Sequence, residues 1–211
     1  MSSISGNERK KRHVIQPIDI EKFSKTISKF QKIEDARDQL WDRARTLIRD
    51  GYEVEAYILI LATWNFARFR YFMKEFNLDE FRSVIKKINP IFRRLESKSF
   101  IDINYKDKSL ITDIKYIYES LKDIAEQTGA SKIMALKNPK LFIMWDTEIR
   151  RIYHIDNIAK PHHYIEFLMK MRDIFGGLEW NETKSKKDFA KAIDEYNYVI
   201  ADNNRRKRKN N

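Results

Sequence analysis

The chain contains no cysteine, and its five glycines and four prolines are scattered over 211 residues. The absence of cysteine excludes disulfide frameworks, thiol nucleophiles, cysteine-based zinc sites and Cys₄-bound iron–sulfur clusters. The scattered glycines exclude a glycine-rich phosphate-binding loop. A long hydrophobic run is also missing, because the most apolar stretch, residues 54–63, is about half the ~20 residues of a membrane-spanning helix. We therefore expect no membrane partner.

The N-terminal residues are polar and basic, with no apolar segment of the kind that a secretory signal contains. We expect an intracellular, cytoplasmic protein. The four histidines lack the spacing of a metal site, and His162 and His163 follow Pro161 as surface or helix-capping residues would. The sequence therefore predicts no metal site and no cofactor.

Positive charge is in excess, since 42 Lys and Arg stand against 31 Asp and Glu, a formal net charge of +11. More than half of the excess lies at the two ends of the chain, where apolar residues are too few to be buried. We expect a basic flexible N-terminal tail (1–16), an α-helical domain (17–200) and a basic flexible C-terminal tail (201–211). The C-terminal tail supplies candidate nucleic-acid contacts, which are Arg205, Arg206, Lys207, Arg208 and Lys209.

The hydrophobic pattern is helical along the domain, with apolar residues three and four positions apart and no sustained alternation. A content of 42% hydrophobic and 13% aromatic residues is enough for a core. The sequence therefore predicts a single all-α domain. Its expected helices span residues 18–32, 33–50, 54–76, 79–94, 109–129, 131–136, 146–155, 161–175 and 184–200, with Gly51 and Gly129 as stops and Pro90 as a kink or break.

The most informative stretch runs from residue 129 to 152 and places a lysine and an aspartate at the starts of two successive helices. Lys132 lies in the first turn of a short helix, and Asp146 caps the next one. The two side chains are expected to meet across one cleft, where burial beside apolar neighbours would lower the pKa of Lys132. The alternative is structural, because a buried Lys–Asp pair can simply tie two helices together.

This arrangement resembles the core of the helix-hairpin-helix DNA glycosylase superfamily over about residues 107–156. The resemblance implies that Lys132 corresponds to the lysine that forms a Schiff base with the sugar. It also implies that Asp146, in the step Trp145-Asp146-Thr147, corresponds to the catalytic carboxylate.

A closer likeness is to distant relatives of that superfamily that share three sequence steps. These steps are Ala130-Ser131-Lys132, a Pro-x-x-Phe-x-x-x-Asp step from Pro139 to Asp146, and a helix centred on Trp64. The chain departs from the glycosylase hairpin in having one glycine, Gly129, where that hairpin has two or three. An altered active site is therefore expected.

A second group of basic residues alternates with aromatic side chains, as in proteins that bind single-stranded nucleic acid. Arg68 and Arg70 are the candidate contacts, among aromatics at positions 66, 69, 71 and 72. The alternative is a core stripe with arginines reaching out to solvent.

Together these features predict a nucleic-acid-binding protein, with DNA the favoured partner, that has a glycosylase-like helical fold and an altered site. Two alternatives stay open at this point. The first is an active DNA glycosylase or lyase that uses Lys132 and Asp146. The second is a non-catalytic helical module for protein interaction.

Overall fold

The computed structural model describes residues 18–64, 69–70, 73–74, 76–156 and 158–210. Within these ranges the chain forms eight α-helices and no strand, which confirms the all-α prediction. None of the described helices is long and apolar enough to cross a lipid bilayer. In chain order the helices are α1 (Ile20–Arg49), α2 (Glu53–Trp64), α4 (Leu78–Leu95), α5 (Lys108–Lys137), α6 (Thr147–Ile152), α7 (Pro161–Phe175), α8 (Glu182–Ser185) and α9 (Phe189–Lys209).

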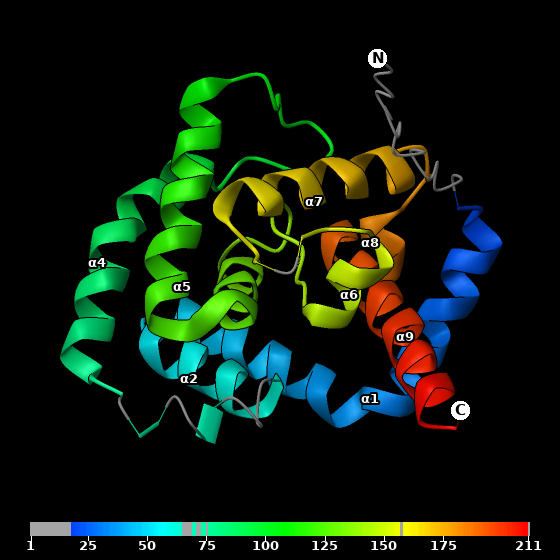
Figure 1. Cartoon of the computed structure of the whole chain (residues 1–211), viewed down its shortest axis with the longest axis horizontal. Coiled ribbons are helices and arrows are strands. Elements are labelled where there is room, and N and C mark those ends of the chain that lie inside the picture. The colour runs from blue at the N-terminus through cyan, green and yellow to red at the C-terminus, as the bar shows by residue number, and fades with distance from the viewer. Residues whose placement is uncertain (1–17, 65–68, 71–72, 75, 157, 211) are drawn as a thin grey trace, which may run out of the picture.

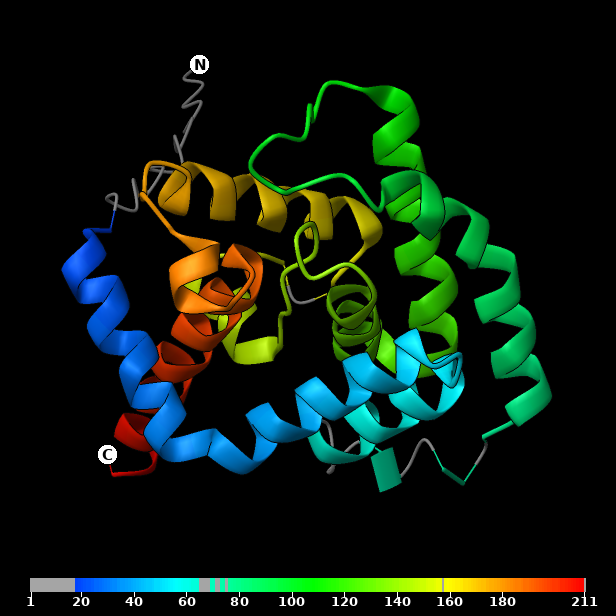
Figure 2. The ribbon, with the colours of Figure 1, turned by 180° about the vertical axis from the view of Figure 1, so that it is seen from behind.

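The helices surround a central segment of α5. In Figure 1, α7 crosses the top, α4 and the first half of α5 stand on the left, and α9 lies with α6 on the right. Helices α1 and α2 run along the base, and the reverse view in Figure 2 shows α1 continuing upward beside α9. Helix α1 therefore joins the two sides of the molecule.

Helix α5 contains a sharp break that directs its second segment into the core. Glu126 has φ 58° and ψ 173°, which is outside the helical region. Every residue of the following stretch, 129–136, is buried. The prediction that a helix ends at Gly129 is therefore wrong, because the break lies three residues earlier. Gly129 instead permits close packing, since a Cβ there would lie 2.9 Å from Leu61 Cδ2.

Two other predicted boundaries also differ from the structure. The segments expected at 18–32 and 33–50 form one continuous helix, α1, which begins after the cap Asp19. Of the kink or break expected at Pro90, the break is wrong: α4 continues through Pro90, because one missing backbone hydrogen bond does not outweigh the packing of its apolar face. The predicted start of α7 at Pro161 is confirmed, and His163 Nδ1 accepts a hydrogen bond from the backbone N–H of Lys160 at 3.2 Å.

Helix α9 extends beyond the domain boundary that we expected at residue 200. It continues to Lys209, so most of the segment predicted as a flexible tail is helical. Asp202 and Arg206, one turn apart, form an ion pair at 2.7 Å that supports this last part. The predicted N-terminal tail, 1–16, lies outside the described residues.

A single buried asparagine joins the end of α4 to the turn that follows α5. Asn138 Nδ2 donates to the carbonyl oxygen of Leu95 at 2.7 Å. Its Oδ1 accepts from the backbone N–H groups of Lys140 and Leu141, each at 3.2 Å. The side chain is 6% exposed, so water cannot readily replace these bonds.

Replacing Asn138 with alanine should lower the free energy of unfolding by about 1–2 kcal/mol, because three hydrogen bonds of a buried side chain are lost while Leu95 O and Leu141 N each keep a second backbone partner. The control is Asn104→Ala, since exposed Asn104 accepts one similar bond, from Lys106 N at 3.0 Å. Urea unfolding of both variants measures the difference. Equal and small losses would show that Asn138 is not a structural tie.

Candidate functional site

Residues Ser131 and Trp145 hold together the two segments that carry the predicted site. Ser131 Oγ accepts a hydrogen bond from Trp145 N at 3.2 Å, and it lies 3.2 Å from Trp145 O. The indole Nε1 of Trp145 donates to the carbonyl oxygen of Gln127 at 3.2 Å. Trp145 is fully buried against Tyr164, with ring centroids 5.0 Å apart, as expected of a core residue. The next residue in each segment is therefore fixed in position.

Asp146, which follows Trp145, contacts two helices with its two carboxylate oxygens. Oδ1 accepts from the backbone N–H of Ile149 at 2.8 Å, which makes Asp146 the predicted cap of α6. Oδ2 forms an ion pair with Arg205 Nη1 of α9 at 3.1 Å. The carboxylate is 32% exposed, so a ligand can still reach it.

Lys132, which follows Ser131, is buried and donates to the carbonyl oxygen of Trp64, the last residue of α2. The structure records no ion pair between Lys132 and Asp146, both of which are described. Burial lowers the pKa of Lys132 to about 8. The charge of Asp146 opposes this shift, and the charges of Arg37 and Arg205 add to it. This is the direction expected from the sequence.

Lys132 and Asp146 line one cavity of about 310 Å³, so the prediction that they meet across a cleft is confirmed. The direct Lys–Asp pair of the structural alternative is not formed, because Lys132 is bonded to Trp64 O and Asp146 is paired with Arg205. The cavity is completed by residues from α2, the second segment of α5, the start of α6, and α9. These are Trp64, Thr128, Thr147, Glu148 and Arg205.

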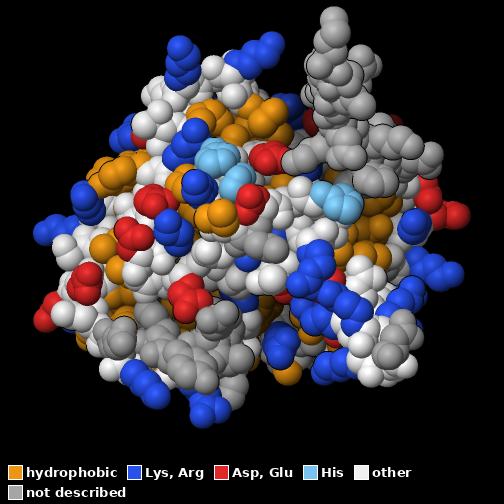
Figure 3. All heavy atoms as spheres, viewed as in Figure 1, with side chains coloured by type: hydrophobic (Ala, Val, Ile, Leu, Met, Phe, Trp, Pro, Cys, Tyr) orange, Lys and Arg blue, Asp and Glu red, His pale blue; other side chains and the backbone are white. Residues whose placement is uncertain are grey.

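The basic end of α9 borders this cavity. Arg208 forms an ion pair with Glu148, which Arg151 also contacts at 2.7 Å. The hydrogen bond from Arg208, with the charges of Arg208 and Arg151, lowers the pKa of Glu148 although partial burial opposes the shift. Figure 3 shows Lys and Arg side chains gathered over the C-terminal part of α9. Ion pairs thus hold this helix end against α6.

The other predicted contacts divide into three groups. Arg206, Lys207 and Lys209 lie on the same end of α9 without lining the cavity. Arg70 is exposed and does not line the cavity either. Arg68 lies outside the described residues.

Sequence reasoning assigned no site role to Thr128, Thr147 and Glu148, and it named Trp64 only as the centre of a helix. Thr147 and Glu148 could have been predicted to line the site, because residues in the first turn of a helix lie near its capping residue, which here is Asp146. Thr128 and Trp64 could not have been predicted in this way. The break at Glu126 brings Thr128 to the cavity, and the end of α2 brings Trp64 there.

Comparisons of the chain with models of protein families, with curated proteins and with solved structures find no match. Among the described residues, no three His, Asp or Glu side chains are grouped as metal ligands would be. The chemistry of the cavity therefore has to be argued from its own side chains.

The two contacts of Asp146 can be separated by mutation. Asp146→Ala removes both the cap and the ion pair and should lower the free energy of unfolding by about 1–2 kcal/mol. Asp146→Asn keeps a good capping residue and loses only a half-exposed ion pair, so its loss should stay below about 1 kcal/mol. Urea unfolding at pH 7 measures both, and equal losses would contradict the capping role.

Proposed function

We propose that this chain binds DNA and that the Lys132–Asp146 cavity receives a nucleotide turned out of the strand, where Lys132 reacts with C1′ of the sugar. The single observation that supports this is the presence of a buried, low-pKa lysine and a carboxylate in one cavity. The resemblance to helix-hairpin-helix DNA glycosylases points to the same two residues.

The low pKa gives Lys132 the reactivity that the proposal requires. With a pKa of about 8, about a quarter of the Lys132 side chains are neutral at pH 7.5. At the ordinary value of 10.5 the neutral fraction would be about one in a thousand. Only the neutral amine has the lone pair that attacks carbon. To attack, the amine must release the carbonyl oxygen of Trp64.

The proposed reaction starts from the open-chain aldehyde of an abasic sugar. The lone pair of Lys132 Nζ forms a bond to C1′, and the carbonyl oxygen takes up a proton. A second proton passes from the nitrogen to the new hydroxyl group, which leaves as water while the nitrogen lone pair forms the C=N bond. The Asp146 carboxylate stabilises the positive charge of the resulting protonated imine across the cavity. If a base is still attached, the same carboxylate stabilises the cationic sugar as the base departs. Asp146 therefore serves both steps through its charge.

DNA binding in this proposal relies on the basic end of α9. Arg205 and Arg208 lie beside the cavity, and Lys207 and Lys209 add charge on the same helix end. Phosphates next to a turned-out nucleotide would come close to these side chains. Contacts of this kind weaken as salt increases.

Borohydride trapping on abasic DNA tests the chemistry, because hydride reduces the imine to a stable covalent adduct. We expect an adduct with the wild-type chain, mapped to Lys132 by peptide mass, and its rate should increase about tenfold per pH unit below about pH 7 and level off above about pH 8, as the neutral fraction of Lys132 does. Lys132→Gln should form no adduct at that position, whereas Lys140→Gln, an equal charge change at an exposed residue, should behave as wild type.

Binding of the same DNA, measured by fluorescence anisotropy at two salt concentrations, separates failure to bind from failure to react. We expect Lys132→Gln to bind within about twofold of wild type. Saturating binding by the wild type without any adduct would remove the Schiff-base role. Absence of binding at low salt would remove the DNA proposal as a whole.

A further inference from the structure

A polar groove lies at the opposite end of α2 from the Lys132–Asp146 cavity. It has a volume of about 480 Å³ and runs between the first turn of α2 and one face of α4. Because α2 has 12 residues, the two cavities are separated by roughly 18 Å along this helix. The groove is within the range of about 300–1,000 Å³ that is usual for small-molecule sites.

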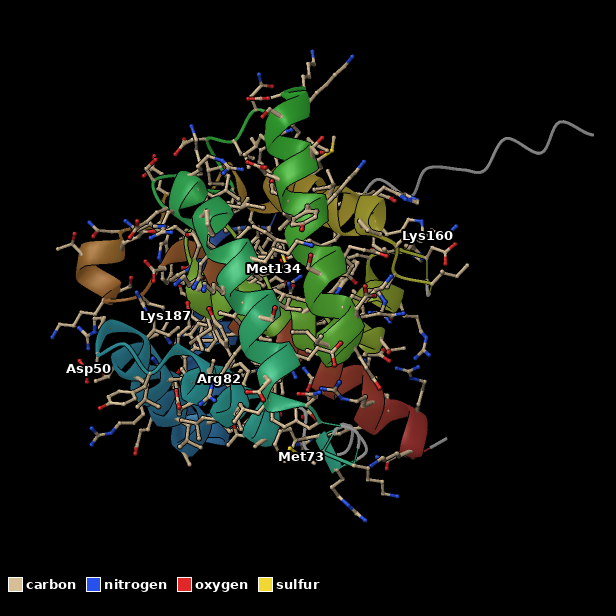
Figure 4. All side chains as sticks on the ribbon, turned by 90° about the vertical axis from the view of Figure 1, so that its left-hand side faces the viewer. Asp50, Met73, Arg82, Met134, Lys160 and Lys187 are labelled. Carbon is tan, nitrogen blue, oxygen red and sulfur yellow. The ribbon has the colours of Figure 1, made fainter. Side chains whose placement is uncertain are left out.

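Three basic side chains of α4 line the groove, and the fold uses them little. Arg82, Lys86 and Arg93 are spaced by four and seven residues, which places them on one face of the helix. Figure 4 shows Arg82 where α4 faces the turn between α1 and α2. Among the described residues, the one ion-pair partner of Arg82 is an exposed Asp79, at 3.9 Å. Lys86 and Arg93 have no side-chain hydrogen bond or ion pair among the described residues.

The acidic residue deepest in this groove is already neutralised. Glu53 forms an ion pair with Lys137 and accepts hydrogen bonds from Asn89 at 2.6 Å and Tyr57 at 2.9 Å. These partners hold the pKa of Glu53 below its usual value although burial opposes the shift. The remaining acid of the groove is Glu55, which is exposed. Three cations against one acid leave a local positive charge.

We infer that this groove binds the phosphate groups of a nucleotide. Free arginine and lysine side chains on one helix face are suited to phosphate oxygens, which accept several charged hydrogen bonds at once. The amino end of α2 adds partial positive charge. Tyr52, on the rim, is 57% exposed and offers a ring on which a base can stack. The phosphates belong either to a free nucleotide or to a strand.

The test uses two pairs of neighbouring residues with the same charge change. Lys86→Gln with Arg93→Gln removes two cations of the groove, whereas Lys87→Gln with Arg94→Gln removes two cations on the same helix that do not line it. Calorimetry with thymidine triphosphate and anisotropy with a labelled oligothymidylate measure the Kd. We expect the groove variant to bind about tenfold or more weakly and the control within about twofold of wild type.

The two probes also distinguish the source of the phosphate. Binding of the triphosphate alone assigns the groove to a free nucleotide, and competition between the two probes assigns it to a strand. Equal weakening in both double variants would show general attraction to a basic protein and would overturn the proposal, as would no binding of either probe.

This inference does not depend on the chemistry of Lys132. Lys132→Gln should leave the Kd of the triphosphate unchanged within about twofold, because Lys132 lies at the other end of α2. Loss of triphosphate binding in Lys132→Gln would place the ligand in the other cavity and contradict the groove. Loss of borohydride trapping alone would leave the groove intact.

Discussion

The contact between Ser131 and Trp145 is the constraint on which the candidate site depends. Each residue is followed by one of the two chemically important side chains, so the hydrogen bonds at 3.2 Å between them bring Lys132 and Asp146 to one cavity. The burial of Ser131 and Trp145 makes these bonds costly to exchange with water. The break at Glu126 makes the contact possible, because it directs residues 129–136 into the core beside the segment that ends at Trp145.

Helix α9 provides the second constraint. Asp194, which is buried, accepts the backbone N–H of Met144 at 2.5 Å and thereby supports the segment before Trp145. About three turns further along α9, Arg205 takes Asp146 as its partner and adds a positive charge near Lys132. The charge of Arg205 favours a neutral Lys132, whereas the charge of Asp194 opposes this effect. The helix itself is tied to α1 by buried Lys191, which contacts Asp38 at 3.0 Å and Glu195 at 2.7 Å.

Periodicity and capping residues were enough to predict the all-α class, the start of α7 at Pro161 and the cap at Asp146. The shared cleft of Lys132 and Asp146 was also predicted, but on a premise that is wrong for Lys132, which lies six residues after the break at Glu126 and not in the first turn of a helix. The break at Glu126 could not be predicted, since a positive φ favours glycine and Gly129 stands three residues away. The basic end of α9 was predicted as a flexible tail because it has few apolar residues to bury. Its helix is held instead by ion pairs with Asp146 and Glu148, which are distant in the sequence.

The central claim is that the fold buries Lys132 enough to make its amine available near neutral pH. The most direct measurement is an NMR titration of the lysine side chains in the folded protein, with the Lys132 signal assigned from Lys132→Gln. A midpoint of about 8 is expected for this signal. A midpoint near the ordinary value of 10.5 would show that Lys132 is solvated and would contradict the account.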